Sequence, residues 1–224
     1  MAVQFRAGAS TAESSAANLT ISRPTGTADG DFLVATVYME DDSPGVTITA
    51  PSGWTALTGG FATTASPDMR LAVYYKIASS EPTSWTWTHS SKYRGGIVAG
   101  FRSDASATLE LDAEGTIATG TTNAPASSVT TTVANTMLAW MAVNFFENAV
   151  TQPTGFTEVA DTPGTEVAYK AQAAAGDTGS LAGSMSGGAD WVCKVIAIRE
   201  ASGASTKAPP PRRRPLRVWN RRAA

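Results

Sequence analysis

The chain has few groups with which to build a covalent, metal-bound or catalytic framework. It contains one cysteine, Cys193, and one histidine, His89, among 224 residues. A single cysteine excludes an internal disulfide and any zinc site built from several thiolates. Folding must therefore depend on a packed core, as in a protein that matures in a reducing cytoplasm.

Charged residues are also scarce. They make up 16% of the chain, against roughly 25% in an average globular domain. Thr, Ser and Gly supply the polarity instead, a composition that favours extended strands and tight turns over long helices. No segment has a convincing helical pattern.

Long apolar runs are absent as well. Residues 1–6 alternate in polarity and lack the apolar region of a signal peptide. The longest apolar stretch, residues 137–146, contains Asn144 and is too short to span a bilayer. We therefore expect no Sec export and no membrane partner.

Strand signals recur instead along the chain. Short runs rich in β-branched and aromatic residues are separated by turn residues such as Gly30, Pro51 and Pro82. The clearest runs are residues 32–38, 71–77, 85–88 and 96–101. The sequence predicts an all-β protein.

The strand signals also repeat in order. Four segments of the first half match later segments, at offsets of 105, 102, 94 and 97 residues. The matched pairs are 32–35 with 137–140, 50–55 with 152–157, 75–76 with 169–170, and 98–102 with 195–199. An internal duplication is predicted, with halves at about 1–103 and 129–200 and a crossing connection at 104–128.

Two related halves fit either one sandwich or two in tandem. We favour one antiparallel β-sandwich over residues 1–200, jelly-roll-like, with one half on each side. A half of about 100 residues with so few large apolar side chains would be marginal alone.

The C-terminus differs in character from the rest. Residues 201–211 read as a flexible and then proline-rich linker, and residues 212–224 form an arginine-rich arm. Residues 207–224 hold seven basic and no acidic residues, whereas the rest holds ten basic and 19 acidic ones; +7 and −9 give the net −2. The residues of the arm expected to bind a partner are Arg212, Arg213, Arg214, Leu216, Arg217, Val218, Trp219, Arg221 and Arg222.

Three roles for this arm compete. It could anchor the chain to an acidic protein surface, bind nucleic-acid phosphates, or serve as a solubilising end. The interleaved apolar residues favour the protein anchor, because they add buried area, and their alternation with arginines would suit a strand added to a partner sheet. The acidic body opposes the nucleic-acid role.

Aromatic residues offer a core or a binding face. Trp85 and Trp87 share one side of a strand. Buried, they would centre the core, which we favour; exposed, they could stack on sugar rings and form a glycan-binding site. Trp54 is expected to pack under its own turn, with Phe156 in the equivalent place.

Candidate catalytic groups are few. His89 lies near Ser90, Ser91 and Asp104 in sequence, but a Ser/His/Asp arrangement requires that the groups meet in space, and no Gly-x-Ser-x-Gly elbow is present. We interpret His89 as a turn residue and expect no catalytic residues.

The acidic clusters could bind a ligand or simply be exposed to solvent. The clusters at 29–31 and 40–42 could bind a hard cation, but no calcium-loop pattern is present, so we interpret them as solvated turns. Glu110, Asp112 and Glu114 alternate along a possible strand, which indicates solvent exposure or a charged interface; a glycosidase carboxylate pair is the minor alternative. No metal or cofactor is expected, since the Gly-Gly pairs also lack a phosphate-loop context.

Several motifs together resemble a β-sandwich module of tailed-bacteriophage structural proteins. They are Gly30 to Ala35, Pro51-Ser52-Gly53-Trp54-Thr55, Tyr74 to Ala78, Glu81-Pro82 and Trp85-Thr86-Trp87. The resemblance covers about residues 1–200 and excludes the arm.

The resemblance implies a non-enzymatic accessory protein on the virion surface, of the head-decoration or minor tail type. Combined with the arm, it predicts a capsid decoration protein that binds other virion proteins, the major capsid protein or tail proteins, and could form a homo-oligomer. A minor tail protein or carbohydrate-binding host-adhesion module is the alternative.

Overall fold

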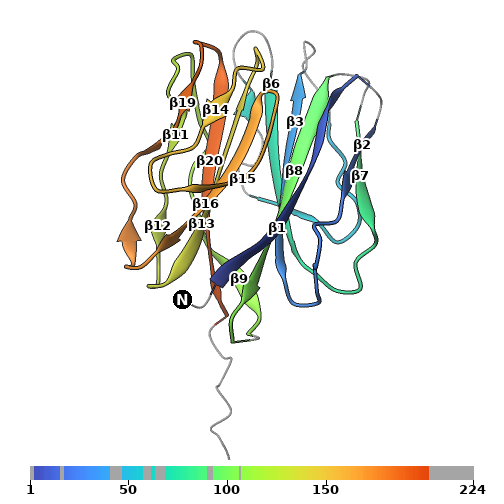
Figure 1. Cartoon of the computed structure of the whole chain (residues 1–224), viewed down its shortest axis with the longest axis vertical. Coiled ribbons are helices and arrows are strands. Elements are labelled where there is room, and N and C mark those ends of the chain that lie inside the picture. Colours follow the sequence, from blue (N-terminus) through green and yellow to red (C-terminus); the bar gives the residue numbers. More distant parts are fainter. Residues whose placement is uncertain are drawn as a thin grey trace, which may run out of the picture.

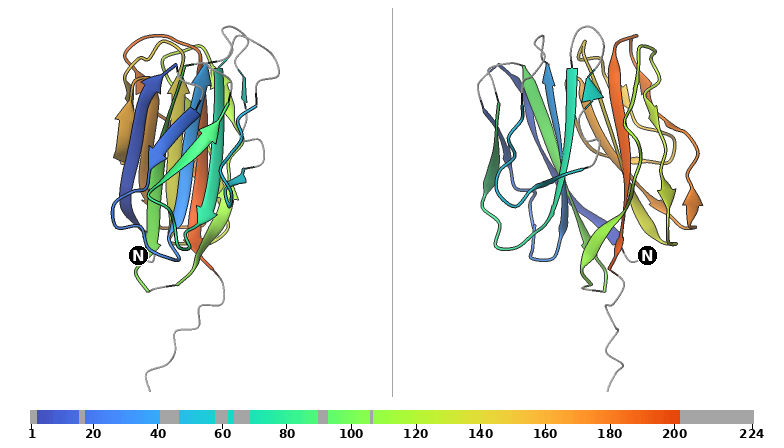
Figure 2. Two further views of the ribbon diagram at one scale, coloured as in Figure 1. Left: turned by 90° about the vertical axis from the view of Figure 1, so that its right-hand side faces the viewer. Right: turned by 180° about the vertical axis from the view of Figure 1, so that it is seen from behind.

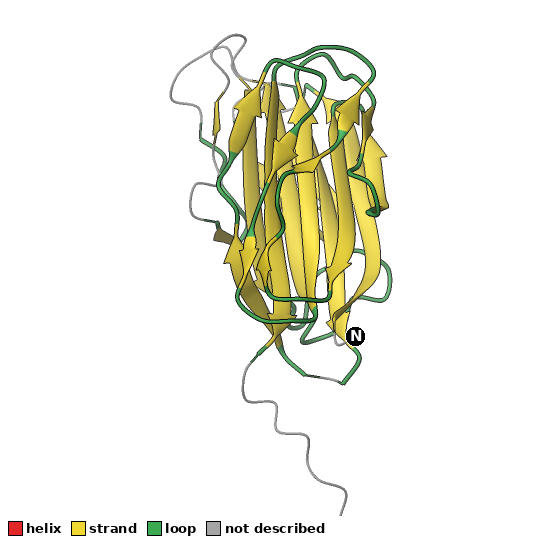
Figure 3. Cartoon of the chain, turned by 90° about the vertical axis from the view of Figure 1, so that its left-hand side faces the viewer, coloured by secondary structure: helices red, strands yellow, loops and turns green. Residues whose placement is uncertain are grey.

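The computed structural model describes residues 3–15, 18–40, 47–57, 62–63, 69–89, 93–105 and 107–201. These residues form strands and loops without any helix (Figure 3), and the strand pairs are antiparallel. The all-β prediction is confirmed. The predicted arm, and the linker after residue 201, lie outside the described residues.

Two six-stranded sheets form the centre of the body (Figure 1). The first follows the order β1 (Val3–Ser14), β8 (Arg94–Ser103), β3 (Phe32–Glu40), β6 (Met69–Ile77) and β4 (Thr55–Ala56), with β5 (Ala62–Thr63) also on β6. The second follows the order β10 (Ala118–Gly120), β20 (Trp191–Glu200), β13 (Thr136–Asn144), β16 (Thr165–Gln172) and β15 (Thr157–Thr162), with β9 (Leu109–Glu114) also on β20. Each sheet thus comes from one continuous part of the chain.

Short strand pairs cover the outer faces of the two sheets (Figure 2). On the first sheet the pair is β2 (Asn18–Ser22) with β7 (Ser84–Thr88). On the second the pairs are β11 (Ala126–Ser127) with β18 (Leu181–Ala182), β12 (Thr130–Thr131) with β17 (Gly176–Asp177), and β14 (Val150–Thr151) with β19 (Ser184–Met185).

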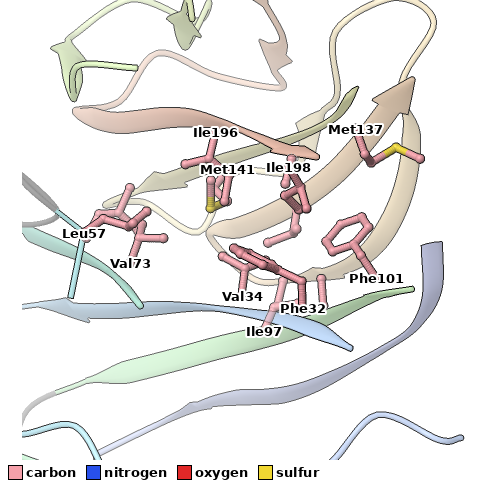
Figure 4. Packing of buried hydrophobic residues seen from close by; sticks show 14 of the residues in the cluster. Phe32, Val34, Leu57, Val73, Ile97, Phe101, Met137, Met141, Ile196 and Ile198 are labelled. Atoms are coloured by element: carbon pink, nitrogen blue, oxygen red, sulfur yellow. The ribbon is translucent and has the colours of Figure 1, made fainter. Parts of the chain in front are cut away.

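One hydrophobic core joins the inner faces of both sheets. Phe32, Val34 and Phe101 of the first sheet pack in the same cluster as Met141 and Ile198 of the second (Figure 4). Because each sheet also has an apolar cluster on its outer face, strands such as β3 and β13 are buried on both sides and lose the usual alternation. The body is a β-sandwich with an additional outer layer on each side.

The two sheets place matched residues at equivalent positions. Val34 lies opposite Tyr75 in the β3–β6 pair, and Ala139 lies opposite Tyr169 in the β13–β16 pair. These residues match at the offsets of 105 and 94 that the sequence repeat shows. The geometric correspondence is a finding, and the duplication that would explain it stays a prediction.

The matched turns also share their conformation. Gly53 and Gly155 have φ angles of 83° and 82°, a region that favours glycine. The next residue, Trp54 or Phe156, donates its amide to the carbonyl of the proline three residues earlier, at 3.3 and 3.0 Å. Both aromatic side chains are buried, as expected for Trp54.

Residues 104–128 differ from the expected simple connection. They supply β9 and β10, which pair with β20, and β11 of the outer layer. Gly115 separates β9 from β10, where a Cβ atom would lie 2.1 Å from the carbonyl oxygen of Ser128. The close backbone approach therefore requires glycine.

Candidate functional site

The candidate catalytic groups do not meet. His89 follows β7, while Asp104 follows the far end of β8. The ten residues of β8 span roughly 33 Å at about 3.3 Å per residue, so these two groups lie toward opposite ends of the first sheet. Ser90 and Ser91 lie outside the described residues.

The candidate glycan-binding tryptophans are core residues. Trp87 is 0% exposed and Trp85 is 4% exposed. Trp54 packs edge-on against Trp85 with ring centroids 5.2 Å apart, and the indole nitrogen of Trp85 donates to Glu81 at 3.1 Å. The structure supports the core interpretation, and neither ring offers a face on which a sugar could stack.

The acidic row on β9 forms ion pairs with two basic residues of the second sheet. Arg199 lies 2.8 Å from Glu110 and 3.6 Å from Asp112, and Lys194 lies 3.2 Å from Glu114. The side chain of Asp112 is fully buried. The expectation of solvent exposure is therefore wrong for Asp112, whereas the side chain of Glu110 is 37% exposed.

The acidic cluster at 29–31 stabilises turns. Asp31 is buried, accepts a hydrogen bond from Arg6 at 2.9 Å and another from the amide of Ala28 at 2.8 Å. Asp29 accepts the amide of Ser80 at 2.7 Å. Asp31 is therefore buried and paired, contrary to the expectation of a solvated turn, whereas Asp29 is exposed as expected.

The remaining acidic cluster is only partly described. Glu40 accepts the hydroxyl of Tyr38 at 2.7 Å, and residues 41–42 lie outside the described residues. No group of three His, Cys, Asp or Glu side chains suited to a metal ion gathers within the described part of the chain.

The described chain begins and ends at one end of the body, which we name the proximal end. Val3 pairs with Ser103 at the end of β8, and the amide of Ala201 donates to Thr108 at 2.8 Å after β20 ends. Figures 1 and 2 show that β1 begins and β20 ends at this end. The described chain therefore leaves the body at the proximal end, after Ala201.

The opposite end, which we name the distal end, carries the exposed aromatics. Here β3 and β13 finish: the amide of Glu40 donates to Tyr93 at 2.8 Å, and that of Phe145 donates to Asp190 at 3.1 Å. Tyr93 is 55% exposed and Phe146 is 64% exposed, and they are the large apolar side chains exposed within the described residues. The sequence contained no signal for this exposure.

The loop that presents Phe146 is held in place from several sides. Asn144 is buried, and its side-chain amide both donates to and accepts from the backbone of Asn148, each at 2.9 Å. Glu147 has a φ of 51°, a strained conformation for glutamate. Phe145 packs edge-on behind Phe146 at 5.2 Å.

Three interacting carboxyl groups, Glu158, Asp161 and Glu166, lie on β15 and β16. Together with Glu147 on this loop they form what we name the acidic corner. Glu166 lies opposite Asp161 in the β15–β16 pair, and a Cβ atom built on Gly164 would lie 3.4 Å from the Cα of Glu147. Glu166 is 0% exposed, and neither of its carboxyl oxygens has a hydrogen-bond partner in the described structure.

Three of these carboxyl groups, Glu158, Asp161 and Glu166, repel one another. Burial raises the pKa of Glu166 to about 9, and repulsion from Glu158 and Asp161 adds to the effect. Burial, with repulsion from Glu158, also raises the pKa of Asp161. Within the described residues, no ion pair involves any of these four carboxyl groups.

Comparisons with known proteins identified no relative of this chain. No protein-family model, no curated protein and no solved structure matches it. Within the described residues, no helix is long and apolar enough to cross a membrane.

Proposed function

We propose that this chain is a non-enzymatic accessory protein of a tailed-phage particle, a decoration protein on the outer capsid surface anchored by residues 212–224. The sandwich is the displayed body, and the arginine-rich arm is the attachment. The motif resemblance suggests the particle, and the arm suggests the anchor.

One observation carries this proposal: the body is complete before the arm begins. Its three apolar clusters lie within residues 3–198, and the chain leaves the proximal end after Ala201 with a hydrogen bond to Thr108. A further segment with seven positive charges is therefore not needed to fill the core. Attached at that end, the body would present its distal end outward.

The anchoring step is best explained by binding to an acidic protein surface. Arginine guanidinium groups pair with carboxylates in a bidentate manner, and Leu216, Val218 and Trp219 can add apolar contact area. Many copies on one lattice would gain avidity even when each arm binds weakly.

The test is co-sedimentation with virions of the phage that would carry this protein. The native copies are removed from these virions beforehand. The full chain should sediment with the particles, whereas a chain ending at Ser205 should stay in solution with an unchanged melting temperature. Equal sedimentation of both chains would overturn the anchor.

Two additional comparisons in this experiment separate charge from apolar contact and capsid from tail. Replacing Arg212, Arg213 and Arg214 with Gln tests the charge, and a Leu216→Ser/Trp219→Ser variant tests the apolar contacts without changing the charge. Isolated capsids and isolated tails, used separately, distinguish a decoration protein from a minor tail protein.

A further inference from the structure

The acidic corner is built to attract an extended cation. Glu147 is exposed on the loop before β14, and Glu158 and Asp161 are exposed on β15. None of the three makes a side-chain hydrogen bond or ion pair with a described residue, in contrast to the β9 carboxylates. Because the described carboxylates do not form a compact metal site, a spread set of positive charges suits them better.

Glu166 adds an independent sign of a missing partner. A buried polar group without a hydrogen bond costs roughly 1–3 kcal/mol, so such groups call for an explanation. Glu166 lies beneath the exposed carboxylates, opposite Asp161. A cation bound over Asp161 would relieve the repulsion that these carboxyl groups exert on each other.

Phe146 gives the corner an apolar contact next to its charges. The Asn144–Asn148 hydrogen bonds hold this loop before any partner arrives, so little conformational entropy would be lost on binding. The surface thus combines a preorganised aromatic ring with unpaired carboxylates.

We propose that the acidic corner binds the arginine-rich arm, residues 212–222, of a second copy of this chain. The arm supplies arginines for Glu147, Glu158 and Asp161, and it supplies Leu216, Val218 and Trp219 for Phe146. The inference rests on the proposed function, in which the arm binds an acidic protein surface, and it names one such surface.

The second copy is favoured over the same chain by geometry. The described chain leaves the proximal end at Ala201, whereas Glu147, Asp161 and Glu166 lie toward the distal end, about the length of β20 away, roughly 33 Å. The eleven steps from Ala201 to Arg212 span at most roughly 39 Å when fully extended. If the whole arm binds within one chain, Arg212 included, residues 202–211 must be almost fully extended, whereas a neighbour stacked head to tail removes this requirement.

Head-to-tail contact is heterologous, so each copy offers one arm and one acidic corner. Such copies form short chains or a closed ring on a particle. Self-association should weaken with added salt, because exposed charge pairs are screened.

Sedimentation velocity of the full chain over a wide concentration range tests the proposal. The expected result is a sedimentation coefficient that rises with concentration and returns to that of the monomer when the arm is removed after Ser205. Monomers at every concentration would overturn the proposal, as would compaction that is independent of concentration, since that indicates binding within one chain.

Substitutions in the corner locate the site. Glu147→Asn with Asp161→Asn should weaken self-association about tenfold, and asparagine suits the left-handed conformation at 147. Asp104→Asn removes one exposed charge at the proximal end and should change association by less than about twofold. Equal effects of the two variants would exclude the corner as the site.

The particle assay separates this inference from the proposed function. Self-association without particle binding would sink the virion proposal and keep the corner as the acceptor of the arm. Particle binding by a chain that stays monomeric in solution, with the Glu147→Asn/Asp161→Asn variant binding normally, would keep the virion proposal and overturn the corner as the acceptor of the arm.

Discussion

The ammonium group of Lys194 lies 3.2 Å from a carboxylate oxygen of Glu114, on the inner face of the second sheet. Lys194 is 1% exposed and lies opposite the core residue Met141. Its ammonium also donates to the carbonyl of Gly115 at 2.8 Å. A buried lysine is tolerated between the sheets because acceptors from the β9–β10 edge meet it there.

Removing the carboxylate of Glu114 should destabilise the protein more than removing the ammonium of Lys194. Glu114→Gln removes a carboxylate that lies 3.2 Å from the buried ammonium and should lower the free energy of unfolding by about 2–3 kcal/mol, whereas Lys194→Met should cost less. Urea denaturation measures both. A larger loss for Lys194→Met would contradict the idea that the carboxylate compensates a buried charge.

The aromatic residues of the matched turns should contribute similarly to stability. Trp54→Ala and Phe156→Ala each empty a buried site beneath a turn and should cost about 3–5 kcal/mol. A surface control, Phe146→Ala, should change the free energy of unfolding by less than about 1 kcal/mol, since that ring is 64% exposed. Thermal and urea unfolding followed by tryptophan fluorescence provide the comparison.

Glu166 should make the protein less stable as pH rises. Its pKa is about 9 in the folded chain, against an ordinary value of 4.5, so the unfolded chain loses this proton first. The contribution of Glu166 to stability is fully present below pH 4.5 and falls by about 1.4 kcal/mol per pH unit until pH 9.

Glu166→Gln removes that slope. The difference in melting temperature, variant minus native, should be near zero at pH 4.5 and positive at pH 8. Glu158→Gln, which only removes a repelling neighbour, should give a smaller shift in the same direction. A pH-independent difference would show that Glu166 has an ordinary pKa.

Cys193 should be chemically silent in the folded protein. The thiol is fully buried, and this burial raises its pKa well above the usual value, which keeps it from forming the reactive thiolate. Iodoacetamide should modify it in urea and leave it unmodified in native buffer over the same time. Rapid native labelling would mean that the outer cluster of the second sheet opens easily.

Local patterns were sufficient for much of the fold. The β-rich runs at 32–38 and 71–77 became strands β3 and β6, and the Pro-x-Gly-aromatic segments became turns with glycine at positive φ. These are properties of a few neighbouring residues, so the sequence contains them directly.

Other features depended on which segments meet. The sequence showed that Trp85 and Trp87 share a face, but only packing against Trp54 showed that this face is covered. It showed that Glu110, Asp112 and Glu114 alternate. It did not show that β9 would lie beside β20, where Arg199 and Lys194 form ion pairs with them.

The sequence by itself determined that this protein is all-β, that its strands recur at a spacing near 100 residues, and that a basic arm follows an acidic body. Only the tertiary structure decided which charges are paired, which aromatics are exposed, and that Asp161 and Glu166 lie toward the end opposite Ala201, where the described chain leaves the body. The reason is physical: strand and turn propensities act between neighbours in the chain, whereas burial and electrostatic potential depend on residues that folding brings together from distant positions.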